Sequence, residues 1–249
     1  MKILLINDDG IQIELYRETL SLLNELNYEV FSFLPKTNQS ACSASISLNT
    51  NISMTSNRCS TYEICGTPTD CLHIGINYLK KLNKCPDLII SGINDGLNYG
   101  TTIAYSGTVK AAMEANLYKI NSIAFSLVEK RRNIELKSEL KNMVEHIINF
   151  YNERQYVGFT LNVNLFNEEK LQNLSDEKEI MDRNFILPNV NVIDDCSIHI
   201  SCNKSSFSYP VDISIGGICR QNGYALDDKQ RKNFFTIYNH IKKQCICKA

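Results

Sequence analysis

The sequence predicts an α/β fold in which a mostly parallel sheet is covered by helices on both faces. Two observations carry this prediction. Short, continuous apolar runs, such as residues 3–6 and 87–91, are typical of buried parallel strands. These runs alternate with segments in which apolar residues recur at helical spacing, beginning with residues 12–26.

The predicted elements follow one another regularly over the first two thirds of the chain. Strands are predicted at about residues 3–6, 28–34, 63–65, 87–91, 122–128 and 159–163. Helices are predicted at about residues 12–26, 69–79, 106–118 and 134–151. Pro35 ends the second strand, and Thr67 or Thr69 is expected to cap the helix that begins around Pro68.

From about residue 167 the pattern becomes irregular. Short β-like pieces follow at residues 197–202 and 206–215, and the lysine-rich segment from about residue 229 has helical spacing. We therefore expect an α/β core over residues 1–166, followed by a β-rich and helical C-terminal extension over residues 167–249.

Composition excludes several classes of function. The 249 residues carry a net charge of −1, so no basic field attracts a nucleic-acid polymer. No segment has the roughly 18–20 apolar residues that span a bilayer, so no membrane partner is expected. The N-terminal apolar run stops at residues 7–10, too early for a signal peptide, which favours a cytoplasmic location.

The chain has ten cysteines. In a long chain without an export signal, free thiols are expected rather than a disulfide framework. No C-x-x-C pair with zinc-ligand spacing is present. Cys245-x-Cys247 comes closest to a ligand pair, and that alternative stays open.

Two adjacent carboxylates, Asp8 and Asp9, follow the first predicted strand. Like charges this close repel, and one of them would normally take up a proton unless a cation lies between them. Oxygen ligands suit Mg²⁺, Mn²⁺ or Ca²⁺ better than Zn²⁺. The alternative is that an aspartate caps the following helix, which is the commoner role of an isolated Asp-Asp-Gly turn.

Two further polar loops follow predicted strands. The serine-rich segment 40–45 offers hydroxyl groups to a metal or a phosphate, although a simple surface loop could have the same composition. Residues 91–100 contain three glycines and two asparagines, at a spacing that is not the dinucleotide fingerprint. Asn94 offers an amide oxygen to a metal, and Asn98 offers an amide N–H to a phosphate oxygen.

Ser106, Gly107 and Thr108 open the third predicted helix. A helix N-terminus presents free N–H groups and the positive end of the helix dipole, which suits a phosphate, although a cap without a ligand explains the motif by itself. Together with the acidic pair and the two loops, the motif predicts metal-assisted hydrolysis of a phosphate ester at the strand ends of one sheet.

Five motifs, in this order, resemble the SurE (survival protein E) family of 5′/3′-nucleotidases and acid phosphatases. They are MKILLINDDGI, NQSACSASISL, CGTPTDC, SGINDGLNYG and YSGTVKAAMEA, and they cover most of residues 1–128. The resemblance implies a Rossmann-like three-layer core. It also implies a metal-dependent hydrolase that converts nucleoside 5′- or 3′-monophosphates to nucleoside and phosphate.

The resemblance assigns roles to particular residues and implies one divalent cation per subunit, Mg²⁺ or Mn²⁺ first and Ca²⁺ as an alternative. The implied metal ligands are Asp8, Asp9, Ser40 and Asn94. The implied phosphate-binding residues are Ser43, Asn98, Ser106, Gly107 and Thr108. As a hypothesis, Asp8 is the catalytic carboxylate that activates water or, as the weaker alternative, attacks phosphorus.

The resemblance further implies a homodimer or homotetramer, in which residues 167–249 belong to the same domain or form an arm exchanged between subunits. The CGTPTDC motif is expected to be mainly structural, with Asp70 in the first turn of its helix.

The chain departs from the family pattern at several positions. Ala41 stands where the family has a glycine after the metal-binding serine. Asp95 replaces a small neutral residue and adds negative charge near the site. Two other functions stay open: a non-catalytic protein that binds nucleotide or metal, and a phosphatase for other phosphomonoesters or short polyphosphate.

Overall fold

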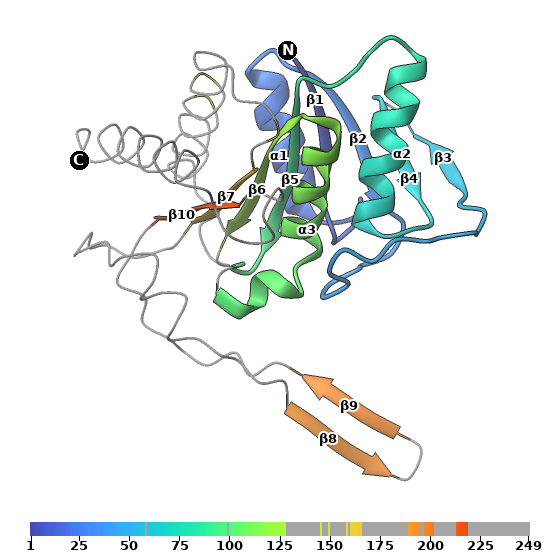
Figure 1. The fold of residues 1–249 in the computed structure, drawn as a ribbon, viewed down its shortest axis with the longest axis vertical. Coiled ribbons are helices and arrows are strands. Elements are labelled where there is room, and N and C mark those ends of the chain that lie inside the picture. The colour runs from blue at the N-terminus through green and yellow to red at the C-terminus, as the bar shows by residue number, and fades with distance from the viewer. Residues whose placement is uncertain are drawn as a thin grey trace.

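The computed structural model has the predicted α/β architecture and describes residues 1–57, 59–98, 100–127, 145, 149, 158, 160–165, 189–194, 197–201 and 213–218 (Figure 1). Its strands are β1 (Lys2–Ile6), β2 (Glu29–Pro35), β3 (Met54–Ser56), β4 (Thr61–Ile64), β5 (Leu88–Asp95), β6 (Asn121–Leu127), β7 (Thr160–Leu165), β8 (Asn189–Asp194), β9 (Ser197–Ser201) and β10 (Ile213–Ile218). Its helices are α1 (Glu14–Glu25), α2 (Pro68–Lys81) and α3 (Gly107–Glu114), with the short 3₁₀ helices η1 (Gly100–Ala104) and η2 (Ala115–Tyr118).

The main sheet has eight strands in the order β10-β7-β6-β5-β1-β2-β4-β3. The strands from β7 to β4 are all parallel, whereas β10 and β3 pair antiparallel at the two edges. From β1 the chain moves outward to β2 and β4, then returns to β5 on the other side of β1. The strand order therefore reverses between β1 and β5, where open α/β sheets form a binding crevice.

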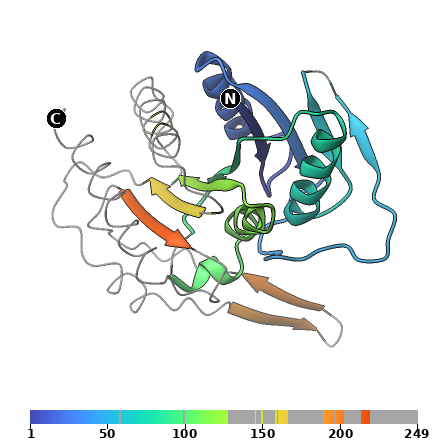
Figure 2. The same ribbon diagram turned by 45° about the horizontal axis from the view of Figure 1, so that its top comes forward.

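Alternating side chains of β1 form the cores of two layers. Ile3 and Leu5 pack in one apolar cluster with residues of α1, whereas Leu4 and Ile6 pack in a second cluster with residues of α2 and α3. Each such fully buried aliphatic side chain contributes roughly 1.5–3 kcal/mol to folding. Figure 2 shows the helices on opposite faces of the sheet, which gives the expected three-layer, Rossmann-like core.

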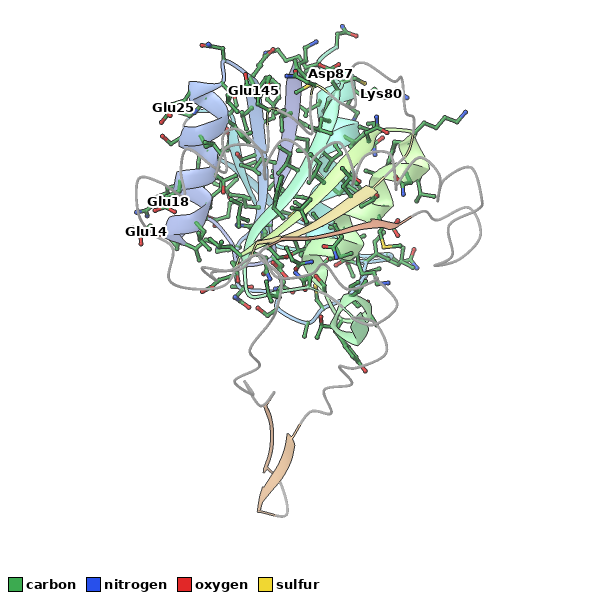
Figure 3. The ribbon with its side chains drawn as sticks, turned by 90° about the vertical axis from the view of Figure 1, so that its left-hand side faces the viewer. Glu14, Glu18, Glu25, Lys80, Asp87 and Glu145 are labelled. Atoms are coloured by element: carbon green, nitrogen blue, oxygen red, sulfur yellow. The ribbon has the colours of Figure 1, made fainter. Side chains whose placement is uncertain are left out.

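Helix α1 covers its face of the sheet with one stripe of side chains. Tyr16, Leu22 and Leu23 are buried against the sheet. The labelled Glu14, Glu18 and Glu25 point away from the sheet in Figure 3. The apolar residues whose spacing predicted the helix therefore form the face that the structure buries.

Strand β5 extends beyond the predicted residues 87–91 and reaches Asp95. A bulge makes this extension: Ser91 pairs with Ala124, but Asn94 pairs with Ser126, so β5 contains one extra residue. Gly92 lies in the bulge with φ of +120°, and a Cβ there would collide with the carbonyl oxygen of Phe125. Sequence periodicity stops at such a glycine, although the pairing continues beyond it.

Other predicted boundaries also change. The predicted helix 106–118 is α3 followed by η2, and the β-like segment 206–215 corresponds in part to β10. Strand β3 was not predicted, since it is only three exposed residues long. Strand β8 was not predicted either, although its sequence NVNVID alternates polar and apolar residues. Strands β8 and β9 pair antiparallel in a separate two-stranded sheet.

Some predictions fall outside the described residues. These are most of the helix at residues 134–151, in which Glu145 and Asn149 are helical, and the segment from residue 229. Five described cysteines have free thiols, as expected, whereas the Cys245-x-Cys247 pair lies outside the described part. Within the described part, no helix is both long and apolar enough to cross a membrane.

Candidate functional site

The acidic pair follows β1, and Asn94 and Asp95 end the neighbouring strand β5. These residues therefore lie at the point where the strand order reverses, at the carboxyl ends of the parallel strands (Figure 1). The sequence placed them at strand ends, and the topology brings the two ends next to each other.

The turn after β1 is built around Asn7 and Gly10. The Asn7 amide donates to the Gly10 carbonyl at 2.9 Å and accepts from the Gly10 N–H at 3.0 Å. Gly10 has φ of +91°, and a Cβ there would lie 2.9 Å from the Pro35 carbonyl oxygen. The N-cap of α1 is Ile13, without a capping side chain, so the capping alternative for Asp8 and Asp9 is wrong.

Asp8 lies against the N-terminus of α3. Its Oδ1 accepts a hydrogen bond of 2.7 Å from the Thr108 hydroxyl. A Cβ on Gly107 would lie 3.1 Å from the Asp8 Cβ and 3.2 Å from its Oδ2, so glycine allows this close approach without displacing Asp8. Burial raises the pKa of Asp8, and the hydrogen bond from Thr108 partly opposes this rise.

Asp9 has one satisfied and one unsatisfied oxygen. Oδ1 accepts a hydrogen bond of 2.9 Å from the side chain of Asn38. Oδ2 is buried and has no hydrogen-bond partner within the described part of the chain. Burial, followed by the negative charges of Asp8 and Asp95, raises the pKa of Asp9 to about 6. A cation bound beside Asp9 would offset these negative charges and stabilise the ionised carboxylate.

The serine loop, residues 36–53, passes over this site. Ser40 is exposed, and its N–H donates to the Asn38 side-chain oxygen at 2.9 Å. Ala41 has φ of +62°, the left-handed conformation that explains a glycine at this position in the family pattern. Ser43 donates its hydroxyl to the Ala104 carbonyl at 2.7 Å, which ties the loop to the segment before α3.

Asp70 connects the serine loop to α2. Thr67 is the N-cap and forms a capping box with Asp70, which agrees with the structural role expected for this motif. The Ser47 N–H and hydroxyl donate to the Asp70 carboxylate at 2.9 and 2.7 Å. Burial alone would raise the pKa of Asp70, but the hydrogen bonds from Ser47 and Thr67 outweigh it and lower the pKa.

The two asparagines after β5 differ in their surroundings. Asn94 donates its amide N–H to the Gly96 carbonyl at 2.7 Å, so its amide oxygen is the atom it can offer a cation. Asn98 is buried and donates to the Ser126 hydroxyl at 2.8 Å. Asn162 and Asn164 from β7 hold the Asn98 backbone, a support that the sequence analysis did not identify.

Ser106 caps α3 by accepting the Val109 N–H at 3.0 Å. Ser106, Gly107 and Thr108 are all buried, and Gly107 and Thr108 contact Asp8 directly. The structure therefore brings the predicted phosphate-binding helix start and the acidic pair into one site. Thr108 has a further contact that the sequence did not indicate, because its hydroxyl orients Asp8.

The donor atoms around Asp8 and Asp9 fit a hard divalent cation. The buried, unpartnered Asp9 Oδ2 needs a positive charge or a hydrogen-bond donor. Among the described side chains, no three His, Cys, Asp or Glu residues form an ion-binding group. Neutral oxygens such as those of Ser40 and Asn94 would therefore have to complete the ligand set.

The thiol of Cys42 lies beside this site but is a poor ligand. Its Sγ would be 3.0 Å from a Cβ on Gly107. Burial and the nearby charge of Asp8 raise the pKa of Cys42 to about 11, and a soft sulfur ligand does not suit a hard divalent cation.

Comparison with known proteins gives consistent matches. The family model described as "Survival protein SurE" matches residues 3–182. "5'-nucleotidase SurE" of Vibrio vulnificus is 43% identical over 145 residues, which are 58% of this chain and 56% of that protein. "5'-nucleotidase SurE" of Clostridium botulinum is 39% identical over 184 residues, which are 70% of this chain and 71% of that protein.

A solved structure agrees with these matches. "Crystal Structure of Sure Protein from Aquifex aeolicus" superposes with a TM-score of 0.65 at 26% identity, and covers 92% of this chain and 96% of that one. The matched segment spans little more than half the length of the Vibrio relative. The family model, in contrast, covers residues 3–182 and therefore most of this chain. The chain belongs to the SurE family.

Proposed function

We propose that this chain is a metal-dependent phosphomonoesterase that hydrolyses nucleoside 5′-monophosphates, or 3′-monophosphates, to nucleoside and phosphate. One observation carries the proposal: the buried, unpartnered oxygen of Asp9 lies beside Asp8, which contacts the N-terminus of α3. This arrangement offers one place for a cation and an adjacent place for an anion. The relatives named 5′-nucleotidase support a nucleotide as the phosphate ester.

Asp8, Asp9, Ser40 and Asn94 would hold the cation, with Mg²⁺ or Mn²⁺ preferred by their oxygen ligands and Ca²⁺ as the alternative. A bound cation supplies Lewis-acid polarisation of the phosphoryl group and a water of lowered pKa. Thr108 fixes the orientation of the Asp8 carboxylate, which then accepts the proton of the attacking water.

The phosphate would lie against the start of α3. The helix dipole and the backbone N–H of Gly107 would stabilise the charge on its oxygens, whereas the Thr108 backbone N–H is directed at the Asp8 carboxylate. Ser43 and Asn98 would border this place; the hydroxyl of Ser43 donates to the Ala104 carbonyl before α3, and the amide of Asn98 donates to the Ser126 hydroxyl. Ser106 fixes the first turn through its cap on Val109.

The same proposal includes a homodimer or homotetramer with one cation per subunit. Residues 1–166 would form the catalytic core, with residues 167–249 as the divergent extension or exchange arm. Strand β10 pairs with β7 in the main sheet, so part of the extension completes this sheet. A cytoplasmic location stays a prediction.

The test is inorganic phosphate release from a panel of nucleoside 5′- and 3′-monophosphates, other phosphomonoesters and short polyphosphate. Each donor is assayed with EDTA, Mg²⁺, Mn²⁺ or Ca²⁺. Metal-dependent release from nucleotides is the expected result. A folded protein that is stabilised by nucleotide and Mn²⁺ without releasing phosphate would instead be a binding protein. Preferential release from other donors would identify a different phosphatase.

A further inference from the structure

Asp95 is a third acidic side chain at this site. It ends β5, the strand next to β1, and its side chain is exposed. Strand β5 runs parallel to β1, with Ser91 paired to Ile6, so Asp95 and the acidic pair both follow this pairing at the same edge of the sheet. The negative charge of the Asp95 carboxylate adds to that of Asp8 in raising the pKa of Asp9.

Asp95 lies outside the ligand set. Among the described residues, Asp8, Asp9 and Asp95 do not form a group of three that could hold an ion together. As an exposed side chain outside the proposed ligands, Asp95 would act on a bound cation through its charge, across space or through a water. Because its side chain is exposed, this effect is weakened by salt.

Resting on the proposed function, we propose that Asp95 sets the order of binding at this site. Its charge strengthens the binding of a divalent cation and repels phosphate until the cation is present. With three carboxylates and no cation, an anion approaching α3 meets net negative charge. Once a divalent cation is bound, most of this charge is neutralised, and the helix N-terminus and the cation attract the phosphate together.

The inference predicts two effects of opposite sign when the Asp95 charge is removed. Asp95→Asn should bind Mn²⁺ more weakly, by about five- to tenfold at low salt for a unit charge several ångströms from the ion. The same variant, in EDTA, should bind inorganic phosphate or a nucleoside monophosphate several-fold more tightly. A substitution that only disturbed the fold of the site would weaken the binding of both Mn²⁺ and phosphate. Opposite changes in the two affinities therefore distinguish a charge effect from structural damage.

The experiment measures Mn²⁺ binding by calorimetry or electron paramagnetic resonance, and phosphate binding in EDTA, for the full chain. Asp95→Asn is compared with Asp95→Ala, which restores a small neutral residue. Asp87→Asn is the matched control, because Asp87 is an exposed carboxylate just before the opposite end of β5 (Figure 3). The difference in Mn²⁺ affinity should shrink in 1 M salt, where the screening length is roughly 3 Å.

Unchanged binding of both probes in the Asp95 variants, or weaker binding of both, would overturn the inference while leaving the proposed metal site intact. A wild-type protein that does not bind Mn²⁺ would overturn the proposed function, and the inference with it. These failures are distinguishable because the first requires a wild-type protein that binds metal.

Discussion

Among single residues, Asp9 should determine how the cation-free protein responds to pH. The pKa of Asp9 is raised to about 6 from an ordinary value of 3.8. Between these values the folded protein binds more protons than the unfolded chain, so stability falls as pH rises from about 4 to 6 and stays low above that range.

Asp9→Asn should remove the part of this fall that Asp9 contributes, while Asp8, whose pKa burial also raises, still contributes its own part. In EDTA at pH 7 the variant should be more stable than the wild type by about 1–2 kcal/mol, after allowing for solvent screening of a half-buried group. Thermal melting from pH 4 to 7 measures the difference, which should vanish near pH 4. A difference in Tm that stays constant over this range would contradict the account.

Gly107→Ala tests the contact between α3 and Asp8. The new Cβ would lie 3.2 Å from the Asp8 Oδ2 and 3.0 Å from the Cys42 Sγ, so Asp8 must shift. We expect a loss of about 1–3 kcal/mol of stability and weaker Mn²⁺ binding. Adding Cys42→Ala relieves only the contact with sulfur. Full recovery of Mn²⁺ binding in that double variant would show that Asp8 was not displaced.

The sequence singled out candidate site residues, and the structure adds partners that no local pattern indicates. Asp8, Asp9 and the start of α3 stood out because carboxylates and a Ser-Gly-Thr helix start are chemically distinctive. Asn38 and Thr108 contact Asp9 and Asp8 across 29 and 100 residues of sequence, so no local pattern identifies these pairs. Only the folded chain shows that Thr108 orients a carboxylate.

At the scale of elements, Asp70 joins α2 to the serine loop. Asp70→Asn should destabilise the protein by about 1–2 kcal/mol at pH 7, because hydrogen bonds to a charged acceptor become neutral ones. Since the pKa of Asp70 is lowered in the folded state, its stabilisation is present above about pH 4 and is lost as pH falls further.

Denaturant unfolding at several pH values measures this difference. Thr67→Ser is the matched control, because serine keeps the capping hydroxyl. A destabilisation by Asp70→Asn that is as large at pH 3 as at pH 7 would show that packing, rather than charge, connects the loop to the helix.

The strands and helices that the sequence predicts, and those that it misses, differ in how much of the signal is local. The buried strands β1, β2, β5, β6 and β7 are apolar enough to be recognised locally, and α2 has a cap that sequence reveals. The continuation of β5 past Gly92 depends on pairing with β6, and β3 has three exposed residues without an alternating pattern. Such pairing depends on which strand lies alongside in the folded protein. The hydrophobic periodicity of a single segment carries no information about that neighbour.

For the whole molecule, β10 makes the chain beyond residue 166 part of the sheet. Strand β10 pairs with β7 over Ile213–Ile218. A fragment of residues 1–166 would expose the β7 edge, so it should melt at a lower temperature and aggregate more readily than the full chain. A fragment ending at residue 218 keeps β10 and is the control. Equal melting temperatures for the two fragments would contradict this role of β10.

The central claim is that a divalent cation held at Asp8 and Asp9 is required for hydrolysis. The most direct measurement titrates Mn²⁺ while following phosphate release from a nucleoside monophosphate, and compares the midpoint with the Kd of direct Mn²⁺ binding. The account predicts that the two values coincide and that Asp8→Asn lowers release by about a hundredfold or more. Release that persists in EDTA, or that continues unchanged in a folded Asp8→Asn protein, would contradict it.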